Sequence, residues 1–454
     1  MTAPSGLKYR SSAASVDRVL LRFLELAITP LRSLLIIPTA LFLFTLTAML
    51  LRPPDVAFYE IDRVAFVLLI LSVIGRTLLG RERFVLQRAS WPMIGLTLLA
   101  VTSVAAQPFD AQSWSLVMAK FIVPFVLFHL SGVVFCKEHD LRQFETFGLI
   151  VLAYLSFTAI AFLFGAKALI FPRFILDESL GYHMDRARGP FLQAVANGVS
   201  LNLLGLLALH AYLRRKIRKL RVPLLLASLP VAILATMTRA VWLSFFVSVG
   251  LLIFRSNDRR LRRICIAISM VAAVGLTVAL SFGDLRRALT DRLEESGPVD
   301  FREAVYTGGW QMFLEKPLTG WGVNQMPAEL ARHVSGYKER ELYPHNTYLE
   351  LLVEHGIVGL ALYAWLIWEL MKLGRGRVPQ SDRGGMLDRH FHSIWPVLLG
   401  VYLVNASVVV MNYQFVNGLM FTLAGMLAGQ QGRAQREDPH AVFGPVNSVL
   451  SFTA

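Results

Sequence analysis

The chain contains repeated apolar segments that are long enough to cross a lipid bilayer, and they limit its possible folds more than any other feature. An α-helix needs about 20 mostly apolar residues to cross about 30 Å of hydrocarbon, and shorter stretches are tolerated inside a bundle. About twelve segments fit this requirement, at residues 34–51, 62–79, 91–107, 115–135, 147–165, 190–212, 222–238, 240–254, 264–282, 347–367, 393–413 and 416–430. Of the 454 residues, 55% are hydrophobic and 17% are charged, whereas soluble domains average about 25% charged residues. The sequence therefore predicts an all-α, polytopic membrane protein with about 12 transmembrane helices.

The distribution of lysine and arginine predicts how these helices are oriented. The formal charge of +14 could indicate a nucleic-acid-binding protein, but no segment of domain size offers a soluble basic face. If the N-terminus is cytoplasmic, the cytoplasmic segments hold roughly 29 of the 45 basic residues, as the positive-inside rule requires. The densest clusters are at 214–221 and 255–263. Both termini are therefore predicted to be cytoplasmic.

This topology divides the chain into regions. The prediction is a cytoplasmic tail with an amphipathic interfacial helix at 18–29, nine spans, a large outer loop, three spans and a second cytoplasmic tail, at residues 1–33, 34–282, 283–346, 347–430 and 431–454. A structureless loop of about 60 residues is improbable, and apolar residues recur at helical spacing within 283–296 and 300–316. We therefore expect a small helical subdomain on the outer face, where the chemistry should be sought.

The end of this large loop carries a histidine directly before a predicted helix. Thr347 and Glu350 have the spacing of a capping box, and Pro344 disfavours helix before it, so the helix should begin within a residue or two of Asn346. The positive end of a helix dipole favours a bound anion and the neutral form of His345. A neutral histidine beside a phosphate is suited to act as a general base. The alternative is that His345 and Asn346 only satisfy hydrogen bonds of the loop and the cap.

Three arginines are predicted to lie near the outer surface. Arg239 occupies a very short turn between two spans, so its guanidinium must sit at or below the interface, where an ionisable side chain indicates function. Arg186 and Arg188 precede the span that starts near residue 190, and Asn197 lies within its first turns. Arginine suits phosphate because its planar fork donates two parallel hydrogen bonds and stays charged. The alternative for each arginine is contact with lipid headgroups.

Two further basic residues fall on or near the same side. Arg302 leads the predicted helix that ends near Pro317, and the glycine-rich segment after it, 320–324, is interpreted as a flexible outlet. Lys120 lies inside the span at 115–135, where it either contacts substrate or extends to the interface. Arg302, Arg239 and one of the arginines before residue 190 could together neutralise a diphosphate.

Four motifs in this part of the chain resemble one known family. The run H-N-x-x-L-x-x-x-x-E-x-G-x-x-G, from His345 to Gly359, resembles the signature of the O-antigen ligase superfamily, which also contains O-antigen and exopolysaccharide polymerases. The other similar motifs are T-R-A-x-W from Thr238 to Trp242, Arg302 with Trp310 and P-L-x-G-x-G at 317–322, and G-P-F at 189–191 followed by Asn197. Thr238 and Ala240 depart from the serine and the commoner glycine of the family. The resemblance covers about residues 185–370, in the same order and spacing.

The resemblance implies an inner-membrane glycosyltransferase with a GT-C-like fold and its active site on the periplasmic face. Its donor would be a glycan on undecaprenyl diphosphate, its acceptor would be lipid A core, and it would need no metal ion, nucleotide sugar or other cofactor. By this resemblance Arg239 and Arg302 would bind the diphosphate, and His345 would activate the acceptor hydroxyl. The predicted substrate-binding residues are Arg186, Arg188, Asn197, Asn346, Glu354 and Lys120.

Two other functions fit the same sequence. A polymerase would use a second lipid-linked glycan as acceptor, and the motifs do not separate it from a ligase because they describe the shared donor side. A transporter of lipid-linked sugars would need charged or broken helices near the membrane midplane and often has internal repeats. No clear repeat is present, and Lys120 is the main buried charge that would support a transporter.

Overall fold

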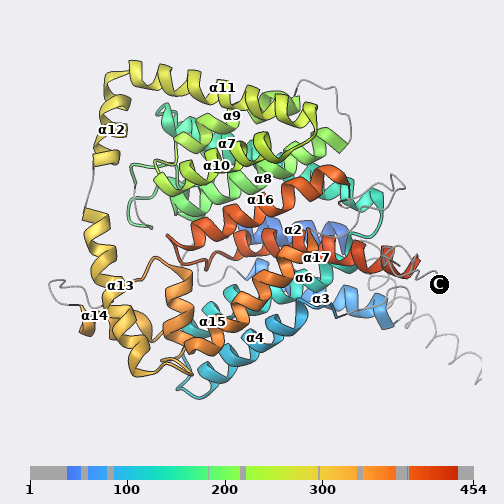
Figure 1. The fold of residues 1–454 in the computed structure, drawn as a ribbon, viewed down its shortest axis with the longest axis vertical. Helices are drawn as coiled ribbons and strands as arrows, with labels where there is room; N and C mark the ends of the chain where they lie inside the picture. The colour runs from blue at the N-terminus through green and yellow to red at the C-terminus, as the bar shows by residue number, and fades with distance from the viewer. Residues whose placement is uncertain are drawn as a thin grey trace, which may run out of the picture.

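The computed structural model describes residues 38–52, 60–78, 86–181, 184–214, 221–294, 297–334, 341–374, 386 and 388–437. The predicted interfacial helix at 18–29 and both chain ends lie outside these residues. Within them all regular structure is helical, so the all-α prediction is confirmed. Most of the longer helices run along one common direction, and the C-terminal end of α17 lies at one end of the bundle (Figure 1).

The helices follow one another along the chain with connections of unequal length, the longest of which joins α7 to α8. Their bounds are α2 Pro38–Leu50, α3 Ile61–Leu78, α4 Ser90–Ala105, α5 Ala111–Val117, a π-helix Met118–Ile122, α6 Val123–Val134, α7 Glu138–Leu163, α8 Ala194–Arg214, α9 Arg221–Leu234, α10 Arg239–Arg255, α11 Arg259–Ser281, α12 Gly283–Glu294, α13 Gly297–Glu315, α14 Met326–His333, α15 Thr347–Leu373, α16 Arg389–Ala406 and α17 Gln414–Glu437. Each of the twelve predicted spans overlaps one of these helices or, at 115–135, the continuous run from α5 to α6.

Five of these helical segments are long and apolar enough to cross a membrane. They are Ala111–Val134, Glu138–Leu163, Ala194–Arg214, Arg259–Ser281 and Thr347–Leu373. The chain is therefore a membrane protein with several spanning helices, while the full number of twelve and the likeness to the GT-C fold stay predictions.

Exposed apolar faces show which helices meet the lipid. In the most apolar 18-residue stretch of α11, only 22% of the residues are buried. Met270, Val274 and Leu280 are among its exposed side chains. Contiguous apolar surface of this extent is unusual on a soluble protein. In the most apolar 18-residue stretch of α8, by contrast, 94% of the residues are buried. We therefore place α8 at the centre of the bundle and α11 at its lipid-facing edge.

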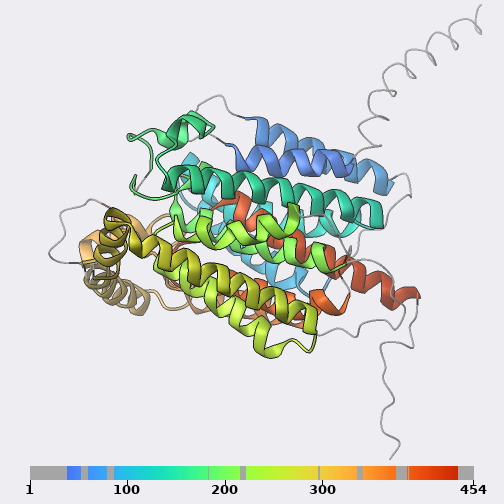
Figure 2. The same ribbon diagram turned by 90° about the horizontal axis from the view of Figure 1, so that it is seen from above.

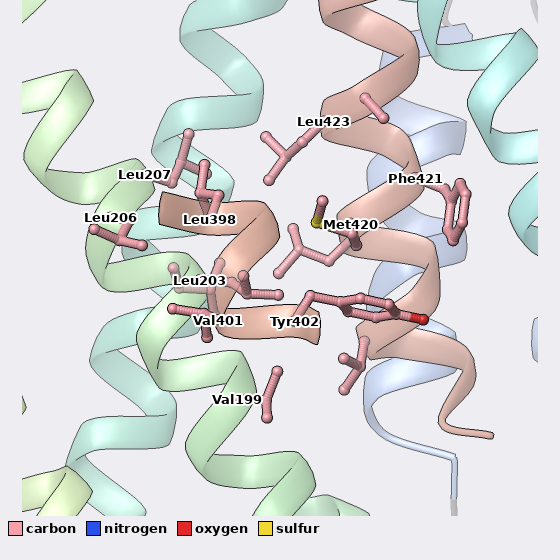
Figure 3. Packing of buried hydrophobic residues seen from close by; sticks show 14 of the residues in the cluster. Val199, Leu203, Leu206, Leu207, Leu398, Val401, Tyr402, Met420, Phe421 and Leu423 are labelled. Atoms are coloured by element: carbon pink, nitrogen blue, oxygen red, sulfur yellow. The ribbon is translucent and has the colours of Figure 1, made fainter. Parts of the chain in front are cut away.

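The central helix packs against two helices from the C-terminal part of the chain. Figure 3 shows this contact between side chains of α8, α16 and α17, namely Val199, Leu203, Leu206 and Leu207, Leu398, Val401 and Tyr402, and Met420, Phe421 and Leu423. On its other side α17 meets α6 backbone to backbone. A Cβ at Gly425 would come within 1.9 Å of the Phe128 carbonyl oxygen, so the glycine permits the close approach that small residues give to membrane helices.

Three helices of the large loop lie at the end of the bundle opposite the C-terminal end of α17. α12, α13 and α14 lie together there in both views (Figures 1 and 2). They cover the predicted helical segments 283–296 and 300–316, and α14 is an additional helix that the sequence did not predict. The basic start of α11, at Arg259, is separated from α12 by the length of a 23-residue helix. This separation agrees with a cytoplasmic basic cluster and an outer helical loop, an orientation that stays a prediction.

Candidate functional site

The turn between α9 and α10 forms the first part of the site. Met237 has a positive φ of +46°, which reverses the chain so that Arg239 begins α10 directly after the end of α9. The indole of Trp242 donates to the Ile233 carbonyl at 3.1 Å and fixes this turn. The segment that carries Arg186 lies against it, because the backbone N–H of Ala187 donates to the Ala235 carbonyl at 3.0 Å. Arg186 and Arg239 therefore come from separate segments that are joined by a backbone hydrogen bond.

Helix α12 packs on this turn and adds a third arginine. Leu289 and Met237 are buried together in a small apolar cluster, with Leu285 at its border. One turn further along α12, the Nε–H of Arg292 donates to the Met237 carbonyl at 3.2 Å. The Met237 carbonyl of this turn thus accepts a hydrogen bond from Arg292, and the turn is followed by Arg239 at the start of α10.

The arginines are close enough to affect one another electrostatically. The pKa of Arg292 is lowered to about 10, first by burial and then by the positive charges of Arg186 and Arg239. The charge of Arg302, at the start of α13, acts in the same direction, and Asp185 acts against it. Like charges disfavour one another's charged form only at short range. We call these four residues the arginine cluster: Arg186, Arg239, Arg292 and Arg302.

His345 lies beside the helix that carries Arg302. Its ring centroid is 6.1 Å from that of Phe301, the residue before Arg302. The φ of His345 is +47°, which is uncommon for a residue other than glycine and is found more often at functional sites. The histidine is half-buried. The structure therefore brings His345 to the same end of the bundle as the arginine cluster.

Asn346 is the N-cap of α15. Its side-chain oxygen accepts from the backbone N–H groups of Tyr348 and Leu349, at 2.9 and 3.1 Å. The predicted start of the helix is confirmed, but the predicted capping box is wrong. Thr347 instead accepts from the Met411 N–H and donates to the Val409 carbonyl. Asn346 thus has a structural role that fixes the residue after His345.

Arg188 and Asn197, predicted to bind substrate, make hydrogen bonds to the backbone of their own region. Arg188 is only 1% exposed, and its guanidinium donates to the carbonyls of Ile175, Leu180 and Asp177. The side-chain amide of Asn197 donates to the Ala187 carbonyl at 2.8 Å. Both residues therefore hold the loop before α8, and this geometry favours a structural role over direct contact with substrate.

Lys120 neither extends to the interface nor faces the arginine cluster. It lies on the π-helix inside the bundle, with its Nζ 2.7 Å from a Glu350 carboxylate oxygen and 3.8 Å from one of Glu354. The side chains of Lys120 and Glu350 are only 7% and 11% exposed. Buried charges need such partners, because an isolated one is very costly. The alternative in which Lys120 extends to the interface is therefore wrong, because its side chain belongs to an internal ion cluster, while substrate binding by Lys120 stays a prediction.

The segment predicted to be a flexible outlet is fixed against α15. The N–H groups of Trp321 and Gly322 donate to the carbonyls of Val353 and Glu354, both at 2.9 Å. The Ile357 N–H donates in return to the Pro317 carbonyl at 2.8 Å. These bonds satisfy the backbone groups that a break in α15 at Gly356 would otherwise leave without partners. The two glycine motifs at 317–322 and 356–359 therefore interlock.

Replacing Gly356 by alanine should destabilise the protein. Gly356 has φ +63° and ψ −165°, a region almost restricted to glycine, and an added Cβ would lie 2.2 Å from the Leu318 carbonyl oxygen. Backbone strain and overpacking together should cost roughly 2–5 kcal/mol. The measurement is the unfolding temperature of the purified protein in detergent. Gly250→Ala in α10, where a Cβ meets nothing within 4 Å, is the control, and an equal unfolding temperature for both variants would contradict the prediction.

Arg292 is the member of the site that the sequence did not single out. It shares α12 with Arg286 and Arg287, and all three belong to one amphipathic helix. Only the packing of Leu289 onto the α9–α10 turn decides that Arg292 points to the cluster. A possible signal was its place next to the apolar face formed by residues 285, 289 and 293.

Part of the chain that carries this site is similar to a known protein family. A model of the family described as O-antigen ligase matches residues 222–364. A comparison with curated proteins gives no match. The matched region extends from α9 into α15 and includes Arg239, Arg292, Arg302 and His345, so it contains most of the site described above. Residues 222–364 of this chain are therefore similar to the O-antigen ligase family.

Proposed function

We propose that this protein is a glycosyltransferase of the bacterial inner membrane. It transfers a glycan from undecaprenyl diphosphate to lipid A core on the periplasmic face and releases undecaprenyl diphosphate. The observation that carries the proposal is the gathering of four arginines from separate segments at the end of the bundle that also carries His345, within or next to the region similar to the O-antigen ligase family. A diphosphate is the anion that such a set of guanidinium groups is suited to bind.

The chemistry follows from the charges. The acceptor hydroxyl oxygen attacks the anomeric carbon of the donor, and the bond from that carbon to the phosphate oxygen breaks. The electron pair leaves with the diphosphate, and the hydroxyl proton passes to His345 as general base. Fixed guanidinium groups stabilise the charge that develops on the leaving diphosphate, without reorganisation at the moment of reaction. The step requires no cofactor beyond these side chains.

An apolar cavity supports a place for the lipid tail. A volume of about 260 Å³ lies between α9, α10, α11 and α12, and its lining is almost wholly apolar. Trp242 on its wall is one turn from Arg239, and Leu289 is one turn from Arg292. A polyprenyl chain that occupied this cavity would hold its diphosphate at the arginine cluster.

The transporter alternative loses its main support. Lys120 is paired with two glutamates, and the break in α15 is filled by the segment 317–322. In transporters such breaks line a substrate site near the midplane. We therefore prefer the enzyme.

The proposed reaction predicts a specific cellular defect. A deletion strain should lose lipopolysaccharide capped with long glycan chains, while lipid-linked chains of full length accumulate. Gel analysis of the envelope glycans checks this result, and complementation with the intact chain should reverse it. Chains stalled at a single repeat would instead indicate a polymerase. An unchanged profile, or movement of lipid-linked glycan between leaflets by the purified protein without bond formation, would refute the glycosyltransferase.

A further inference from the structure

The helix that follows His345 is not one continuous helix. Gly356 separates a short helix, residues 347–355, from the longer part of α15, residues 357–373. We call residues 347–355 the half-helix. Asn346 caps the half-helix and His345 comes directly before the cap. The position of the half-helix therefore sets the position of the imidazole.

A buried ion cluster holds one side of the half-helix. Glu350 and Glu354 are one turn apart on it, and both face Lys120 at 2.7 and 3.8 Å. Lys120 lies on the π-helix Met118–Ile122 between α5 and α6. Such interruptions of α-helices occur often at functional sites. A buried ion pair is weak evidence of stability, so its presence here calls for another reason, and fixing the register of two elements is the best attested one.

The same cluster connects the half-helix to the segment after α13. The second carboxylate oxygen of Glu354 accepts from the Asn324 N–H at 2.8 Å, while the carbonyl of Glu354 accepts from Gly322. This segment follows α13, which carries Arg302. Glu354 therefore links the half-helix that positions His345 to the segment that follows the helix of Arg302. At the start of the half-helix, the Tyr348 hydroxyl donates to the Leu403 carbonyl at 2.8 Å and adds a contact to α16.

We propose that Lys120 and Glu350 are positioning residues for His345, an inference that rests on the proposed function. They act through the half-helix, since both side chains are buried in the bundle and paired with each other. Their ion pair fixes the rotation and depth of the half-helix, and thereby the distance between the imidazole and the arginine cluster. Arg186, Arg239 and Arg292 are on other elements, and the hydrogen bonds that hold their segments together do not involve this ion pair.

The kinetic test uses Glu350→Gln and Lys120→Met in the full chain, purified in lipid nanodiscs. A displacement of about 1 Å can cost on the order of 10²-fold in rate. We expect kcat to fall by about that factor, with unchanged affinity for the lipid-linked donor. The charge-exchanged variant, Lys120→Glu with Glu350→Lys, should recover part of the rate. A purely structural role would instead lower donor affinity, kcat and the folded fraction together, and that result would overturn the proposal.

Glu369→Gln is the matched control. Glu369 is a buried carboxylate of the same α15, paired with Lys372 at 2.8 Å, but it lies beyond the break at Gly356. Its replacement should leave kcat and donor affinity unchanged. If Glu369→Gln and Glu350→Gln reduce kcat equally, the ion pair of the half-helix has no special role and the proposal fails.

A distance measurement separates this inference from the proposed reaction. Spin labels at Tyr343→Cys and Trp310→Cys, both exposed positions, report the spacing between the segment before His345 and α13. In a background without Cys136 and Cys265, Glu350→Gln should broaden or shift the distance distribution, and Glu369→Gln should not. An unchanged distribution in Glu350→Gln overturns the positioning role. If the wild type transfers no glycan while Glu350→Gln still shifts the distribution, the proposed function is refuted and the positioning of residue 345 by the ion pair stands.

Discussion

Replacing His345 by alanine is expected to abolish glycan transfer in practice. A positioned general base contributes about 10²- to 10⁴-fold to a rate, and in the proposed mechanism His345 is the base that takes the proton of the acceptor hydroxyl. Its position directly before an N-cap and beside Phe301 leaves the arginine cluster intact when the imidazole is removed. The measurement is the rate of transfer from lipid-linked glycan to purified acceptor in nanodiscs. Donor binding should persist.

His333→Ala provides the comparison for this variant. His333 is on α14 of the same outer subdomain, and its Nε2 is 2.9 Å from a Glu315 carboxylate oxygen. The pKa of His333 is raised, chiefly by its backbone contact to Glu329 and its hydrogen bond to Glu315, as expected for a surface ion pair. Its loss should change the transfer rate little. Full activity of His345→Ala at equal expression would remove His345 from the mechanism.

Replacing Arg239 by alanine should have an effect of similar size but of a different kind. Loss of one preorganised group that stabilises developing charge costs about 10²- to 10³-fold in rate, and loss of a diphosphate contact should weaken donor binding as well. We therefore expect kcat to fall and the Kd for undecaprenyl diphosphate to rise. Arg239→Lys should recover only a part, because lysine cannot donate two parallel hydrogen bonds.

Two variants on α12 complete this comparison. Arg292→Gln should weaken donor binding, since Arg292 belongs to the arginine cluster and its pKa is lowered by the charges of Arg186 and Arg239. Arg286→Gln, at an exposed position of the same helix, should not. Equal donor binding by the wild type, Arg239→Ala and Arg292→Gln would show that the diphosphate binds elsewhere.

Much of the fold could be predicted from local patterns. Apolar segments give the positions of the helices because a helix in lipid must satisfy its backbone internally and present apolar side chains outward. Helices α12 and α13 were also predictable from their spacing of apolar residues. The break at Gly356 was not, since a glycine in an apolar segment is compatible with a continuous membrane helix. Its geometry depends on the Leu318 carbonyl, which approaches from another part of the chain.

The sequence by itself determined the class of the protein and several of the residues proposed for its chemistry: the spans, the helical outer loop, His345, Arg239 and Arg302. These follow from hydropathy and from motifs that are local in the chain. Only the tertiary structure decided that Arg292 joins the arginine cluster, that Arg188 donates its hydrogen bonds to loop carbonyls, and that Lys120 pairs with Glu350. The reason is physical: the role of a charged side chain depends on the groups it pairs with, and partners far apart in the chain meet only when the helices pack.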